Sequence, residues 1–137
     1  IVVHDTGPIN MASSEQLSGE ELAKTRGAGL AERLEARFGQ HPNVGDLRGR
    51  GLFRGIELVA NRDTKAPFDP ARGLAGKIKK AAFDAGLICY PMQGTIDGRQ
   101  GDHVLLAPPF IIADTQLDEL VDKLDTAIQA SLKEIAA

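Results

Sequence analysis

Segments with the apolar spacing of a helix alternate along this chain with pairs of strand-like segments, and that order restricts the folds open to it. Helical spacing, with a period of about 3.6 residues, is found at residues 20–38, 71–85 and from 114 onward. Strand-like spacing is found at residues 44–50, 52–60, 87–90 and 103–106. Amphipathic helices must bury their apolar face, so this order predicts an α+β fold. We expect a three- to four-stranded antiparallel or mixed sheet covered by helices on one face.

Glycine and proline limit these segments. Gly27 and Gly29 lie inside the first helix and weaken it by about 1 kcal/mol each relative to alanine, so its early turns should depend on packing against another part of the molecule. Residues 61–70 are polar and include two prolines, which predicts an exposed loop. Thr115 and Asp118 have the spacing of a capping pair at the start of the last helix.

The composition is that of one ordinary globular domain. The chain of 137 residues is 42% hydrophobic, and its net charge of -3 favours neither nucleic acid nor an anionic membrane as a partner. Cys89 is the single cysteine, so an internal disulfide is excluded and a reducing, cytoplasmic location is expected. No apolar run approaches the ~20 residues of a membrane helix.

Residues 1–19 show no sustained periodicity, and the chain begins with Ile1 rather than Met. We therefore expect a piece of a longer polypeptide. Residues 1–19 would be an N-terminal segment or linker, and residues 20–137 would be the folded domain.

The first glycine-rich segment, residues 45–59, combines four glycines with three arginines: GDLRGRGLFRGIELV. Glycine allows positive φ or a close backbone approach, and arginine can bind a carboxylate or phosphate through two parallel hydrogen bonds. The pattern therefore fits either an anion-binding site or a β-bulge with solvated arginines. The pattern alone favours the bulge.

A second glycine-rich stretch, residues 91–102, connects the third and fourth strand-like segments and is long for such a connection. Pro108 and Pro109 end the strand that follows, so the chain should be stiff there. A loop anchored on such a strand could present Arg99 to a ligand at little entropic cost. A loop arginine is more often only solvated, and the pattern alone favours that interpretation.

Other residues give little sign of chemistry. His4, His41 and His103 are scattered along the chain, so no metal site is predicted. Cys89 lies between apolar neighbours, which favours an inert buried thiol. Lys65 lies in a loop without the apolar surroundings that would make it a nucleophile.

Three motifs point to a known family. Gly-Arg-Gly-Leu-Phe at residues 49–53 precedes Gly-Ile-Glu-Leu-Val at residues 55–59. Gly101-Asp102-His103 leads to Leu-Ala-Pro-Pro at residues 106–109, and Asp118-Glu119-Leu120 lies on the last helix. In this order, over about residues 20–137, the motifs resemble the C-terminal small domain of class III pyridoxal-phosphate-dependent aminotransferases. The resemblance implies the fold of the small domain of fold-type I enzymes.

The resemblance also implies a transaminase that uses pyridoxal 5′-phosphate (PLP) to move an amino group between an amine or amino acid and a keto acid. In that family a lysine of the large domain holds PLP, so this chain should contain no catalytic or cofactor-binding residue and should be inactive alone. The lysines in its helices lie on polar stripes: Lys24, Lys77, Lys79, Lys80, Lys123 and Lys133. The implied partners are the large domain, a second subunit of a homodimer and the two substrates.

Relatives that act on amino acids commonly carry an arginine shortly before the Gly-Asp pair, where it binds the substrate carboxylate. The resemblance therefore implies that Arg99 binds the substrate, although it lies closer to Gly101 than the family usually shows. Arg48 and Arg50 are expected to be structural, bonding backbone carbonyls or carboxylates of another domain.

Two other interpretations remain open. A free-standing α+β module that binds a small ligand or regulatory effector would share this element order. The basic, glycine-containing strand also resembles an RNA-binding strand. However, RNA-binding sheets need exposed aromatic side chains, and this chain has no tryptophan and one tyrosine.

Overall fold

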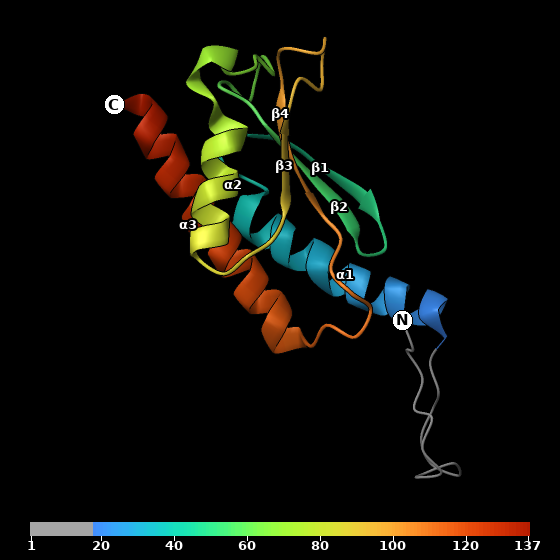
Figure 1. Ribbon diagram of the computed structural model, residues 1–137. Coiled ribbons are helices and arrows are strands. Elements are labelled where there is room, and N and C mark those ends of the chain that lie inside the picture. The colour runs from blue at the N-terminus through green and yellow to red at the C-terminus, as the bar shows by residue number, and fades with distance from the viewer. Residues whose placement is uncertain (1–17) are drawn as a thin grey trace, which may run out of the picture.

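The computed structural model describes residues 18–137, which form three α-helices, a short 3-10 helix and four strands (Figure 1). The helices are α1 (Gly19–Phe38), α2 (Leu74–Asp84) and α3 (Asp114–Ala136), with the 3-10 helix η1 (Pro70–Arg72) ahead of α2. The strands are β1 (Val44–Arg50), β2 (Phe53–Leu58), β3 (Tyr90–Gln93) and β4 (Asp102–Leu106). They form one antiparallel sheet in the order β1-β2-β4-β3, and the α-helices lie on one of its faces (Figure 1). The predicted α+β fold is confirmed.

The core lies between the helices and the inward face of the sheet. Successive side chains of a strand point to opposite faces, and Ile56, Leu58 and Val104 point inward and are almost fully buried. They belong to one cluster with the apolar stripes of the helices: Leu30, Leu34 and Phe38 of α1, Ile78 of α2, and Leu117, Leu124 and Ile128 of α3. Each helix is apolar on one stripe only, and within residues 18–137 none is long and apolar enough to cross a membrane.

Helix α1 begins with a capping box. Ser18 Oγ accepts a hydrogen bond from the backbone N–H of Glu21 at 3.2 Å, and Glu21 Oε2 accepts one from the N–H of Ser18 at 2.8 Å. The helix therefore starts at Gly19, one residue ahead of the predicted start. The rest of the predicted N-terminal segment, residues 1–17 with His4, lies outside the described residues.

The predicted start of the second helix is wrong by three residues. Residues 70–72 form η1, which Asp69 caps by accepting a hydrogen bond from the N–H of Ala71 at 2.9 Å. Gly73 then adopts a φ of 62°, a left-handed conformation that α-helix residues do not adopt, so α2 begins only at Leu74.

The predicted bounds of the third strand are also wrong. Residues 87–89 do not join the sheet, because Leu87 still completes the end of α2 by donating its N–H to Ala82 O at 2.8 Å. Leu87 and Cys89 pack against the core without ladder hydrogen bonds, and the strand runs instead from Tyr90 to Gln93.

The predicted capping pair of the last helix is wrong as well. Helix α3 follows Ala113, whose N–H donates to Gln116 Oε1 at 2.8 Å, and Thr115 lies inside the first turn. Asp118 instead accepts a hydrogen bond from Arg33 Nε of α1 at 2.6 Å. Asp118 therefore forms an ion pair between α1 and α3, whereas its spacing from Thr115 had suggested a helix cap.

Candidate functional site

The turn between β1 and β2 is locked by Arg54. Its guanidinium donates hydrogen bonds to three backbone carbonyls, those of Gly51 at 2.8 Å, Gly49 at 3.2 Å and Gly27 of α1 at 3.3 Å. Helix α1 comes so close that a Cβ on Gly27 would lie 2.3 Å from the backbone of Gly51. Gly27 is therefore the point where the first turns of the helix pack, and Arg54 is fully engaged in holding the fold.

Sequence analysis did not single out Arg54. In the ladder it alternates with Ile56 and Leu58, whose side chains point toward the helices. The two-residue period of a strand could therefore have shown that Arg54 points inward. Its partners on α1 could not have been found from local sequence.

Arg48 and Arg50 lie on β1, and both are exposed. Arg48 pairs with Asp46 Oδ2 at 2.9 Å and with Glu57 Oε2 at 3.1 Å, and the hydrogen bond with Asp46 is the main cause that raises the pKa of Arg48. These carboxylates belong to its own sheet, whereas backbone carbonyls or carboxylates of another domain were the expected partners. For Arg50, no side-chain hydrogen bond or ion pair is found within residues 18–137.

The loop between β3 and β4 is ordered without the help of an arginine side chain. Its ends close through a hydrogen bond from Gly94 N–H to Gly101 O at 2.8 Å. At its tip, Asp97 Oδ1 accepts hydrogen bonds from the backbone N–H groups of Arg99 at 2.9 Å and Gln100 at 2.7 Å. The hydrogen bond from Gln100, followed by that from Arg99, lowers the pKa of Asp97. The backbone of this loop is thus fixed in advance of any ligand.

Arg99 is the basic side chain of this loop. Its backbone N–H is held by Asp97, and its carbonyl accepts a hydrogen bond from Gln93 Nε2 at 3.2 Å. Its guanidinium is exposed, and within the described part of the chain it has no hydrogen-bond or ion-pair partner. The hairpin extends beyond the rest of the sheet (Figure 1). A free guanidinium on a fixed backbone can bind a carboxylate through two parallel hydrogen bonds.

Asp102 and His103 follow the loop and point to opposite faces of the sheet. Asp102 is 2% exposed, and its Oδ1 accepts a hydrogen bond from the N–H of Ala75 in α2 at 3.2 Å. Burial raises the pKa of Asp102, and the Ala75 hydrogen bond opposes that shift. His103 lies opposite Glu57 on the outward face of the sheet, and burial, followed by the charge of Arg48, lowers the pKa of His103.

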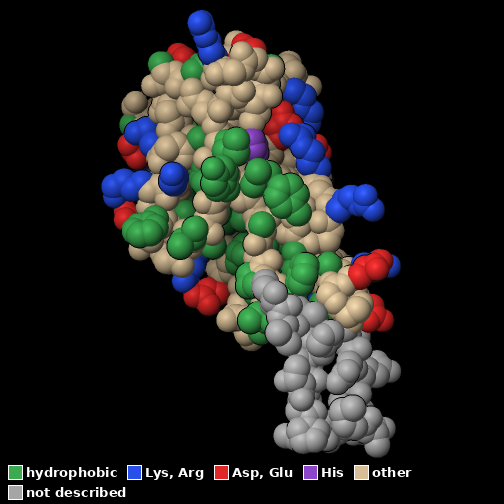
Figure 2. Space-filling model, turned by 45° about the vertical axis from the view of Figure 1, so that its right-hand side comes forward, with side chains coloured by type: hydrophobic (Ala, Val, Ile, Leu, Met, Phe, Trp, Pro, Cys, Tyr) green, Lys and Arg blue, Asp and Glu red, His purple; other side chains and the backbone are tan. Residues whose placement is uncertain are grey.

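The outer face of the sheet, away from the helices, carries an apolar patch (Figure 2). We call this set the outer patch, and its members are Phe53, Tyr90, Met92 and Leu105. Phe53 is 58% exposed and Tyr90 64%, which is unusual for large side chains that share one face. Exposed apolar patches on one face are typical of contact surfaces.

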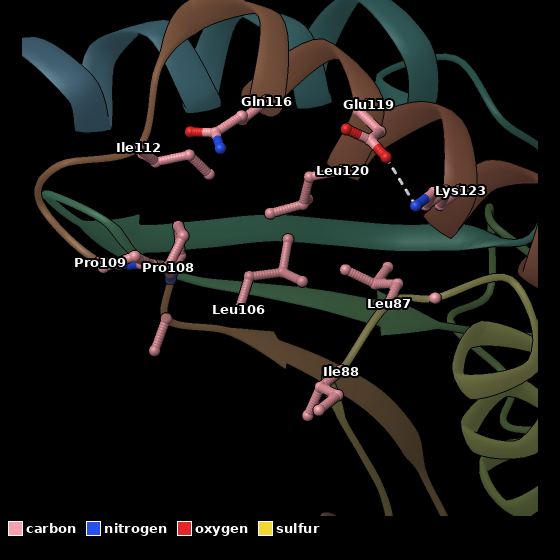
Figure 3. Close-up of a pocket in the computed structure, with 12 residues that line it drawn as sticks. Leu87, Ile88, Leu106, Pro108, Pro109, Ile112, Gln116, Glu119, Leu120 and Lys123 are labelled. Carbon is pink, nitrogen blue, oxygen red and sulfur yellow. Dashed lines mark ion pairs between the residues drawn. The ribbon is translucent and has the colours of Figure 1, made fainter.

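A pocket of about 390 Å³ lies at the end of β4 that is farther from the loop (Figure 3). Leu87, Leu106 and Leu120 contribute apolar lining. Glu119 and Lys123 of α3 form an ion pair of 2.6 Å at its polar side (Figure 3). Sequence analysis did not predict this pocket, because its lining comes from three separate segments.

Most lysines of this chain are already engaged in ion pairs or a hydrogen bond. Carboxylates pair with four of the seven: Lys24, Lys77, Lys80 and Lys123. Lys79 and Lys133 are exposed, and Lys65 donates a hydrogen bond to Gly45 O at 2.5 Å. Desolvation lowers the pKa of a lysine and so activates it as a nucleophile, and an ion pair with a carboxylate has the opposite effect. Each lysine of residues 18–137 is therefore paired, hydrogen-bonded or exposed.

Within the described part of the chain, Cys89 and the two histidines form no cluster of reactive or metal-binding groups. Burial raises the pKa of Cys89 to about 11, so the thiol stays protonated at neutral pH. His41 lies in a turn, where its Nδ1 accepts a hydrogen bond from the N–H of Asn43 at 3.0 Å. Within residues 18–137, no three His, Cys, Asp or Glu side chains lie close enough to share a metal ion.

Comparison with known proteins identifies the family. Residues 7–128 match the aminotransferase class-III family, and this chain belongs to that family. The resemblance inferred from the motifs is thereby confirmed.

Three relatives show how much of such a protein the chain represents. An uncharacterised aminotransferase of Schizosaccharomyces pombe is 46% identical over 82% of this chain and 24% of that protein. A diaminobutyrate–2-oxoglutarate transaminase of Halomonas elongata is 31% identical over 89% of this chain and 25% of that protein. A PLP-bound aminotransferase mutant from Vibrio fluvialis superimposes with a TM-score of 0.73 and 33% identity, over 84% of this chain and 24% of the other. The chain thus spans about a quarter of the length of its relatives.

Proposed function

We propose that this chain is the C-terminal small domain of a PLP-dependent transaminase, which moves an amino group between an amine or amino acid and a keto acid. Membership of the class III family supports this proposal, as does the share of about a quarter of each relative. The Halomonas relative is named for an amino acid and a keto acid, and the Vibrio structure is PLP-bound. In the proposal residues 20–137 are the domain and residues 1–19 an N-terminal segment or linker.

The chain contributes substrate binding and closure, and PLP is held by the large domain. The paired or exposed lysines support this division, so no chemical step is assigned to residues of this chain. The outer patch would pack against the large domain and exclude water from the site between them. An exposed apolar face beside a charged loop is suited to that role.

Arg99 binds the α-carboxylate of the amino donor or keto acid. The observation that carries this proposal is that the Arg99 guanidinium is unpaired within residues 18–137, while hydrogen bonds fix its backbone on both sides. Because the loop is already ordered, little conformational entropy is lost when the carboxylate binds.

Arg99→Ala in the full-length enzyme tests this role. The KM for keto-acid and amino-acid substrates should rise roughly tenfold or more, the loss expected for charge-assisted hydrogen bonds, while the KM for a simple amine should stay unchanged. Arg50→Ala is the matched control, because it removes the same charge from an exposed position on the other hairpin. Equal rises for carboxylates and simple amines would contradict the proposal.

The assignment of the cofactor to the large domain has its own test. Borohydride reduction of the full-length enzyme should attach PLP to a lysine outside these 137 residues, as peptide mapping would show. The isolated chain should neither react nor transaminate. Attachment to any of its seven lysines would overturn the assignment, with Lys65 the first to inspect.

The full-length enzyme is also proposed to be a homodimer, as the family resemblance implies, and light scattering would measure its mass.

The pocket in Figure 3 favours a second candidate, a module that binds a small ligand or effector on its own. A thermal-shift screen of the chain with amino acids and keto acids separates the two. A ligand-induced rise in melting temperature that Lys123→Ala abolishes would support the second candidate, because Lys123 lines the pocket.

A further inference from the structure

Asp102 is the one buried carboxylate among residues 18–137. It is the first residue of β4, and it pairs across the ladder with Gln93, the last residue of β3. These two residues are therefore the root from which the loop of residues 94–101 extends. Asp102 also pairs with Leu58 of β2, so the root belongs to the interior of the sheet.

The same carboxylate caps helix α2. The residue at the N-cap position is Gly73, which has no side chain to accept a hydrogen bond from the first turn. Asp102 Oδ1 fills that role from another element by accepting from Ala75 N–H at 3.2 Å. A helix N-terminus carries a partial positive charge, which suits a carboxylate acceptor. One side chain thus ties α2 to the root of the loop.

The residues between Asp102 and Arg99 are held by close contacts and hydrogen bonds. Gly101 has a φ of 91°, and a Cβ there would lie 2.5 Å from Thr95 Oγ1, so the two sides of the loop are in close contact. The next two residues toward the tip, Gln100 and Arg99, are both held by Asp97. A displacement of the Asp102 backbone is therefore passed on to the Arg99 backbone.

We infer that Asp102 is a positioning residue for Arg99. By capping α2, its carboxylate fixes the root of the hairpin and hence the place where the guanidinium meets its ligand. Asp102 does not touch the substrate, because it is buried toward α2 on the inward face of the sheet. The inference rests on the proposed function only in taking that ligand to be the substrate carboxylate.

Hydrogen exchange in the full-length enzyme tests the coupling itself. Asp102→Ala should speed exchange at the Arg99 and Gln100 amides roughly fivefold, the factor that corresponds to loss of one helix cap. Asp102→Asn should restore the slow exchange, because its amide oxygen can accept the same hydrogen bond. Unchanged exchange at Arg99 and Gln100, with faster exchange at Ala75 alone, would overturn the inference. If the alanine variant does not fold, Asp102→Ser is measured against the same two outcomes.

Kinetics of a double-mutant cycle test whether Asp102 acts through Arg99. Asp102→Ala should raise the KM for the keto acid roughly threefold to fivefold with little change in kcat, and Asp102→Asn should not. In the Arg99→Ala background, adding Asp102→Ala should have no further effect on that KM. A further rise would overturn the inference. If Arg99→Ala alone leaves the KM unchanged, the role proposed for Arg99 fails, and the exchange measurement still decides the role of Asp102.

Discussion

The β1–β2 turn and the β3–β4 loop both combine glycine with arginine, but the arginine side chain has a different role in each. In the first, Arg54 donates to the carbonyls of Gly49, Gly51 and Gly27 and joins the turn to α1. In the second, the carboxylate of Asp97 orders the backbone, and the Arg99 side chain is left exposed.

The difference shows what makes an arginine available for binding. A guanidinium that satisfies three backbone carbonyls cannot leave them without exposing unpaired acceptors, so Arg54 is committed to the fold. A guanidinium on a loop that is ordered by another residue can bind a ligand without breaking hydrogen bonds of the fold. The glycine and arginine content of these segments therefore does not show which arginine can bind a ligand. What shows it is which side chain supplies the hydrogen bonds that order the turn or loop.

The largest effect is expected at the contact between α1 and the β1–β2 turn. Gly27→Ala should destabilise the protein by about 3 kcal/mol, because the new Cβ would lie 2.3 Å from the backbone of Gly51. Thermal or denaturant unfolding measures it. The matched control is Gly76→Ala in α2, where an added Cβ would meet no atom within 4 Å apart from its own helix backbone and chain neighbours, and the helix should gain about 0.5–1 kcal/mol. Equal stabilisation by both substitutions would mean that the close contact does not exist.

Arg54→Ala should cost less, about 2–3 kcal/mol, because three hydrogen bonds to one charged group are lost while the backbone contact remains. Arg54→Lys should recover little of this, since a single ammonium cannot span three carbonyls. Denaturant unfolding measures the loss of stability. The control is Arg50→Ala, whose free energy of unfolding should lie within about 0.5 kcal/mol of the parent. A full rescue by lysine would show that charge alone matters there.

How far the sequence could predict this molecule depends on the distance over which each signal acts. The order of elements and the α+β class follow from local periodicity, which is why they were predicted correctly. The sequence did not decide between an antiparallel and a mixed sheet, since strand pairing is non-local. Residues 87–89 were taken for a strand because their apolar side chains pack against the core, and nothing local shows that they lack ladder hydrogen bonds.

In the candidate site, too, the residues found from local signals differ from those that depend on contacts between distant segments. Arg99 could be proposed from its own loop and a family motif, both of which are local. The bond from Arg54 to Gly27 and the bond from Asp102 to Ala75 each join residues 27 positions apart, so no local pattern contains them. Asp102 was noticed only as part of a motif, and its cap on α2 became visible once the two elements were placed side by side.

The smallest effect on overall stability, and the one most specific to the β3–β4 loop, is expected from Asp97→Ala. Global unfolding should hardly change, because the side chain is exposed, but exchange at the Arg99 and Gln100 amides should quicken roughly fivefold, the factor of one lost hydrogen bond. Asp97→Asn is the control, since it keeps an acceptor oxygen. The pKa of Asp97 lies below the ordinary 3.8, so its contribution is complete above 3.8 and is lost as pH falls through the lower folded value. Exchange by NMR that shows no such dependence on Asp97 would mean that Arg99 is ordered by something else, and the contrast between the two hairpins would fail.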